Sequence, residues 1–236
     1  KNISNSEFLE FKSRWLIKNS DLDLIENYLT KNQIINSHPK LTKYFLDEHL
    51  SRGNIDKACN IFEKISEVIN DDYISKYNIY CLIKSNQIER AQLIYDLKKE
   101  LGFDDKYFEK KINFLLNYSS EIDENISEKT ILDFYLAHKT NPNFLFDPNE
   151  KTKKIIWKYL SSANLLNSLK EIETTDLDKI SLIEKAVNNK NYPESDLFDL
   201  YKRFQFNINQ LLNVESFYKS LTNIEGRALV YQRVLL

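Results

Sequence analysis

The sequence predicts an all-α protein, because three observations agree: a repeat of about 33 residues, helical spacing of the apolar side chains within each repeat, and a scarcity of glycine and proline. The 236 residues include three glycines and four prolines. Strands joined by tight turns need residues that tolerate a positive φ or interrupt regular structure. No Asn-Gly, Asp-Gly or Gly-Gly pair occurs, which argues strongly against a β-rich fold.

The repeat is clearest where two expected helices meet in a turn. Residues 53–58 (GNIDKA) return as residues 86–91 (NQIERA), and residues 20–25 (SDLDLI) precede them by the same distance. Three further columns keep this register: Ile17, Leu50, Ile83 and Leu116; Phe11, Tyr44 and Tyr77; Leu22, Ile55 and Ile88. Apolar residues recur at spacings of three and four within each repeat, which is typical of helices. Each repeat is therefore expected to be a helical hairpin.

One hairpin cannot bury its apolar face alone, so the copies are expected to stack into a solenoid. The small residues Ala58 and Ala91 mark where two helices should approach closely. We expect repeats over residues 1–120 and irregular helical pairs that continue the array over residues 121–236.

Residues 53–65 (GNIDKACNIFEKI) resemble the turn and second helix of a tetratricopeptide repeat, with Gly53, Ala58 and Phe62 on three signature positions. The resemblance covers about residues 6–118 and implies a right-handed α-α superhelix. It departs from the family where Leu46 and Ile79 replace a small residue, and where Ile65 replaces an alanine. Residues 77–102 also resemble a pentatricopeptide unit, a related hairpin that can read single-stranded RNA.

In the tetratricopeptide family the first helix of each pair lines a concave groove, and the resemblance implies a mildly basic groove here. The groove residues expected to bind a partner are Arg14, Lys18, Lys43, Tyr73, Lys76, Tyr80 and Lys84. Lysines beside tyrosines suit an acidic or extended peptide. The asparagines that clamp a terminal carboxylate in some relatives are missing, since Asp47 and Tyr80 occupy that column, so no carboxylate clamp is expected.

Beyond about residue 120 the register fails, but helix signals continue. Residues 147–150 (DPNE) read as a helix start with proline at the first helical position. Residues 192–193 (YP) and 222–225 (TNIE) indicate two more starts. Residues 140–147 are expected to be a loop or hinge.

Neither composition nor motifs indicate catalysis or a cofactor. The formal charge of −2 gives no field to attract nucleic acid or anionic lipid, and isolated glycines cannot form a phosphate loop. His38, His49 and His138 lack metal-ligand spacing. We expect His38 to face solvent and the other two to be structural, and no metal site is predicted. Cys59 and Cys81 are expected to be free, structural thiols.

Two charged motifs have ordinary structural explanations. The pairs 71–72 and 104–105, both Asp-Asp, lie one period apart and precede helices, where acids cap backbone amides. Capping therefore explains them better than Mg²⁺ binding. In the basic run around Lys151, Lys154 and Lys158, the lysines share one helix face, as on a solvated amphipathic helix.

The sequence therefore favours a non-enzymatic scaffold that binds a protein or peptide. Two alternatives stay open: single-stranded RNA binding, as in pentatricopeptide proteins, and the non-catalytic superhelical part of a larger enzyme such as a lytic transglycosylase. A run of apolar residues long enough to span a membrane is absent, so a soluble segment is expected. The start at Lys1 and the absence of methionine leave a removed leader open, and with it a periplasmic or exported rather than cytoplasmic location. The sequence does not indicate an oligomeric state.

Overall fold

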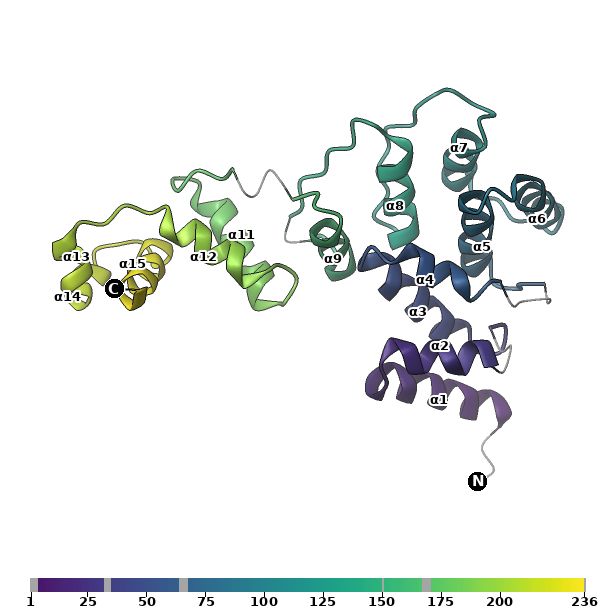
Figure 1. The fold of residues 1–236 in the computed structure, drawn as a ribbon, viewed down its shortest axis with the longest axis horizontal. Coiled ribbons are helices and arrows are strands. Elements are labelled where there is room, and N and C mark those ends of the chain that lie inside the picture. Colours follow the sequence, from purple (N-terminus) through teal and green to yellow (C-terminus); the bar gives the residue numbers. More distant parts are fainter. Residues whose placement is uncertain (1–3, 32–34, 64–67, 150, 167–170, 236) are drawn as a thin grey trace. The chain divides into compact units, whose positions relative to one another are not determined.

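The computed structural model describes residues 4–31, 35–63, 68–149, 151–166 and 171–235. These residues form helices and connecting segments without any strand, which confirms the all-α class. They fall into two compact units, residues 1–145 and 146–236 (Figure 1). Within the described part of the chain, no helix combines the length and the apolar content that crossing a bilayer requires.

The first unit consists of three successive helix pairs followed by two further helices. Its elements are α1 (Asn5–Asn19), α2 (Leu22–Lys31), α3 (Pro39–Ser51), α4 (Ile55–Asn60), α5 (Asp72–Lys84), α6 (Ile88–Glu100), α7 (Lys106–Leu115) and α8 (Ile131–Thr140). The second helices α2, α4 and α6 begin at Leu22, Ile55 and Ile88, each 33 residues after the last. The helix α3 packs against α1, α2, α4 and α5, and α5 packs against α6.

The turns inside the hairpins repeat the same backbone geometry. Gly53 and Asn86 follow α3 and α5 with φ values of 75° and 60°. In both turns the N–H of the next residue donates to the carbonyl five residues before it. This closes the helix end through a left-handed residue, a conformation that glycine and asparagine tolerate better than most residues.

The acidic pairs begin helices, as expected. Asp71 caps α5 by accepting from the N–H groups of Tyr73 and Ile74, and Asp105 caps α7 by accepting from that of Phe108. Capping is therefore confirmed for Asp71 and Asp105.

A disulfide joins neighbouring hairpins. Cys59 on α4 and Cys81 on α5 are bonded, with their Cα atoms 5.4 Å apart. The prediction of free thiols is therefore wrong. The two cysteines are 22 positions apart and belong to different helix pairs, and sequence spacing alone gives no measure of the distance between such residues.

The first unit extends beyond residue 120, because α8 contacts α3 and α7. Residues 119–128, which precede α8, are not helical. They are held against α7 by Lys111, whose ammonium donates to the Asp123 carbonyl, and by Tyr107, whose hydroxyl donates to the Asn125 carbonyl at 3.2 Å. The loop expected near residues 140–147 is present, since α8 ends at Thr140.

The second unit contains α9 (Lys154–Ser162), α11 (Leu177–Asn188), α12 (Glu194–Lys202), α13 (Ile208–Leu212), α14 (Val214–Tyr218) and α15 (Asn223–Leu235). α15 packs against the four helices that precede it. Arg227 on α15 holds Glu184 on α11 with two hydrogen bonds, and the Tyr201 hydroxyl donates to the same carboxylate.

Two of the three helix starts expected in this region are confirmed. α12 begins after Pro193, and α15 begins after Thr222, whose hydroxyl and N–H form a reciprocal cap with Glu225. The start expected at residues 147–150 is wrong, because α9 begins at Lys154. The prediction that Lys151, Lys154 and Lys158 share one solvated helix face is wrong for the same reason, since Lys151 precedes the helix and Lys158 is half-buried. Asn149 instead forms a turn with Thr152, whose N–H donates to its carbonyl at 3.0 Å.

Candidate ligand groove on the first helices

The expected groove residues lie in two different environments. Arg14 and Lys18 on α1 are exposed, Lys84 at the end of α5 is exposed, and Lys43 on α3 is half-buried. By contrast, Lys76 and Tyr80 on α5 are each only 6% exposed. Tyr73, also on α5, is half-buried. Of the residues expected to line the groove, those on α1 are therefore exposed, whereas Lys76 and Tyr80 on α5 are covered.

The covering element is α8, which belongs to the same unit. The hydroxyls of Tyr80 and Tyr135 are 2.7 Å apart, and their rings meet edge to face at 5.3 Å between centroids. The expectation of a solvated, ligand-ready face is thus wrong at Lys76 and Tyr80. The face is polar because it binds polar groups of α8, not because it meets water.

Lys76 is the centre of a buried charged cluster. Its ammonium pairs with Asp105 and lies 3.4 Å from the Asp133 carboxylate of α8. Burial opposes ionisation of Asp105, but the hydrogen bonds from Lys76 and from the Phe108 N–H outweigh it and lower the Asp105 pKa. A buried ammonium between two carboxylates is a stable arrangement only while all three groups are present.

A second polar cluster surrounds Asp47 on α3. The hydroxyls of Tyr73 and Tyr77 both donate to the same carboxylate oxygen, Oδ1, at 2.7 and 2.8 Å. Burial raises the pKa of Asp47 to about 6, although these hydrogen bonds act in the opposite direction. The cluster joins α3 to α5.

The lysines of one groove column connect successive hairpins. Lys43 on α3 pairs at 2.6 Å with Asp71, the cap of α5. Lys76 lies 33 residues later on α5 and pairs with Asp105, the cap of α7. Lys43 therefore binds the start of α5, and Lys76 binds the start of α7.

The sequence contains a signal for α8 that the repeat analysis missed. Residues 131–137 are all buried, and they read ILDFYLA. A helix that is apolar on every side is expected to lie inside a protein rather than on its surface. That pattern could have indicated an element enclosed by the others.

A Ser-His contact in the first unit has a structural explanation. Ser13 on α1 lies 2.8 Å from His38 Nδ1, and the Tyr28 hydroxyl lies 2.9 Å from Nε2. Ser13 and His38 are both buried, and their contact joins α1 to the residue that precedes α3. The prediction that His38 faces solvent is wrong, because its ring connects α1 and α2 to the start of α3. Burial, followed by the charge of Lys12, lowers its pKa.

Of the other histidines, His49 is buried against Phe45 and His138 is half-buried against Phe144. Among the described residues, no group of three or more histidine, cysteine or acidic side chains is placed to hold a metal ion.

Comparison of the chain with protein-family models, with curated proteins and with solved structures yields no match.

Proposed function

We propose that the protein is a non-enzymatic scaffold, a solenoid of tetratricopeptide-like hairpins that binds a protein or peptide partner in its groove. The observation that carries the proposal is the seating of α8 against the first helices. The groove holds a helix of its own chain through Lys76 and Tyr80, so its side chains are suited to polar and aromatic groups presented by a peptide segment.

The binding site proposed for a partner is the open part of the groove. Arg14, Lys18 and Lys43 line it, and α8 leaves all three at least partly exposed. Lys43 already pairs with Asp71, so Arg14 and Lys18 supply most of the available positive charge. Such a surface suits an acidic segment, in which carboxylates meet the basic side chains at the rim.

Selection from a displayed peptide library on the purified chain tests this proposal. We expect acidic peptides to be enriched, and reversal of Arg14, Lys18 and Lys43 to glutamate to abolish their binding. Reversal of Lys151, Lys154 and Lys158 to glutamate is the matched control, because it changes the net charge equally outside the groove. Equal loss in both variants, or no enrichment, would contradict the proposal. Submicromolar binding of a random single-stranded RNA pool would favour the RNA-binding alternative instead.

A further inference from the structure

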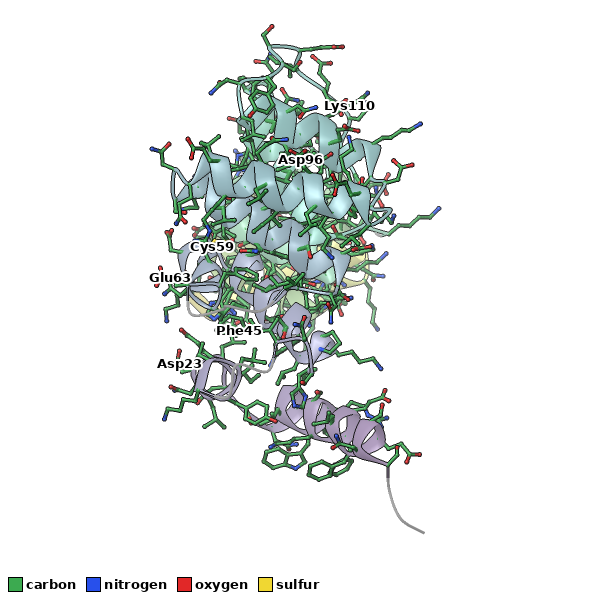
Figure 2. All side chains as sticks on the ribbon, turned by 90° about the vertical axis from the view of Figure 1, so that its right-hand side faces the viewer. Asp23, Phe45, Cys59, Glu63, Asp96 and Lys110 are labelled. Carbon is green, nitrogen blue, oxygen red and sulfur yellow. A yellow bond between two sulfur atoms is a disulfide. The ribbon has the colours of Figure 1, made fainter. Side chains whose placement is uncertain are left out.

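An aromatic stripe on α1 has no role in the groove. Phe8, Phe11 and Trp15 are 52%, 60% and 52% exposed. Their spacings of three and four residues place them on one helix face, while Ser13 and Leu16 are buried on another. In Figure 2 aromatic rings project from α1 on the side away from α2 and α3. Exposed apolar patches of this kind are often functional.

The repeat register shows which kind of surface this is. At multiples of 33 residues, Phe8 corresponds to Leu41 and Ile74, Phe11 to Tyr44 and Tyr77, and Trp15 to Glu48 and Cys81. Leu41, Ile74, Tyr77 and Cys81 are buried on α3 and α5, whereas Tyr44 and Glu48 are half-buried. The face that is exposed on α1 therefore corresponds to a face that is largely buried on α3 and α5.

We propose that the α1 stripe binds the α1 stripe of a second copy of this chain, in an antiparallel pair related by a two-fold axis. In such an isologous contact each surface must be complementary to itself. The aromatic stripe meets this condition directly, because its ends, Phe8 and Trp15, exchange places across the axis while Phe11 lies close to it.

The charges beside the stripe meet the same condition. Glu7, Arg14 and Lys18 lie along one flank, at spacings of seven and four residues, and all three are exposed. An antiparallel two-fold pair brings the acidic start of this flank opposite the basic end of the other copy. Glu7 of each copy then faces Arg14 and Lys18 of the other copy, so the contact occurs twice in the dimer. Lys12, on the other flank, lies 4.3 Å from the Tyr28 ring of its own chain.

A surface that binds an unrelated partner has to be complementary to that partner and not to itself. The self-complementarity of the stripe and its flank therefore favours a second copy of this chain. The exposed parts of the three rings amount to roughly 300 Å² per chain, against about 800 Å² per partner in a standard interface. The pair is therefore expected to be a weak, concentration-dependent dimer with a dissociation constant in the micromolar range or above.

Sedimentation equilibrium of the purified chain alone tests the inference. The dimer contact shares Arg14 and Lys18 with the proposed peptide site, but no peptide is present in this experiment, so its result does not depend on the proposed function. We expect the wild type to dimerise as its concentration rises, and Phe11→Glu to stay monomeric with an unchanged circular dichroism spectrum. A wild type that is monomeric up to about 1 mM, or a Phe11→Glu variant that dimerises equally well, would overturn the inference.

Charge exchange tests the pairing without altering the aromatic residues. We expect Glu7→Lys, and separately Arg14→Glu with Lys18→Glu, to weaken dimerisation about tenfold, because each change acts twice across the two-fold axis. An equimolar mixture of the two variants should restore it, since each chain then meets opposite charges. Glu7→Gln is the control for the helix cap that Glu7 forms with Ser4. Failure of the mixture to dimerise better than either variant alone refutes the antiparallel arrangement.

Discussion

The Lys76 ammonium pairs with the carboxylate of Asp105, the residue that caps the first turn of α7. One lysine thus neutralises the cap of the next first helix and also reaches Asp133 on α8. Three segments of the first unit depend on this one charge. Its counterpart Lys43, one period earlier, forms the same contact with Asp71 at a more exposed position.

Replacement of Lys76 by methionine should lower the free energy of unfolding by about 3 kcal/mol, because it leaves two largely buried carboxylates without a counter-charge. Lys43→Met is the matched control. It removes a pair whose side chains are 37% and 26% exposed, and should cost less than about 1 kcal/mol. Urea unfolding of both variants measures the difference. Equal losses would show that burial does not distinguish the two pairs.

The Asp47 cluster predicts a specific dependence of stability on pH. The folded pKa is raised to about 6 from an ordinary value of 3.8, so between these values the folded protein binds more protons than the unfolded chain. The contribution of Asp47 to stability is therefore greatest below about pH 4 and is lost as the pH rises through about 6.

Asp47→Asn should remove this dependence, because its amide oxygen can still accept from Tyr73 and Tyr77 but carries no charge. We expect the variant to gain stability relative to the wild type between pH 4 and pH 7. Unfolding curves at several pH values measure the change. A stability difference that is the same at pH 4 and pH 7 would contradict the raised pKa.

The Cys59–Cys81 disulfide should stabilise the first unit by about 3 kcal/mol, since it closes a loop of 22 residues in the unfolded chain. Reduction of the wild type and double substitution of both cysteines by alanine should each lower the urea midpoint. Reduction of the double variant is the control and should have no effect. Two reactive thiols in protein purified under oxidising conditions would show that the bond does not form.

The ring nitrogens of His49 are buried without a hydrogen-bond partner. Leu16 and Leu82 occupy the same repeat column and are buried as well. His49→Leu should therefore stabilise the protein by about 1 kcal/mol, because it removes two unsatisfied polar atoms and keeps most of the volume.

The gain from His49→Leu should grow as the pH falls below about 6.5, the ordinary histidine pKa. Burial, together with Lys57 and Arg52, lowers the folded pKa of His49, so the unfolded chain takes up the proton first. Thermal unfolding at pH 5.5 and pH 8 measures both effects. His49→Ala is the control for packing and should destabilise. A leucine variant less stable than the wild type would mean that the ring has a partner.

Residues 1–145 should unfold as one cooperative unit, because α8 packs against α3 and α7 and its side chains bind Lys76 and Tyr80 of α5. A fragment that ends at residue 120 lacks Asp133 and Tyr135 and leaves Lys76 and Tyr80 uncovered. It should stay helical but unfold at lower urea and over a broader range. Urea unfolding of the fragments 1–145 and 1–120, followed by circular dichroism, measures the difference. Equal urea midpoints would show that α8 contributes little to stability.

The sequence by itself determined much of the local structure of the first unit, although it placed the start of α9 too early. The start of each second helix, the left-handed turn at Gly53 and its counterpart Asn86, and the caps at Asp71 and Asp105 follow from patterns within a few residues. Helical periodicity and capping are local properties, so one sequence is enough to predict them.

The tertiary structure alone decided what the groove residues contact. Lys76 meets Asp133 across 57 positions, and Tyr80 meets Tyr135 across 55. The Cys59–Cys81 bond and the burial of His38 likewise depend on how the hairpins stack. A lysine that binds a ligand and a lysine that binds its own chain look alike in sequence. The difference is whether another helix covers it, and that depends on the packing of segments far apart in the chain.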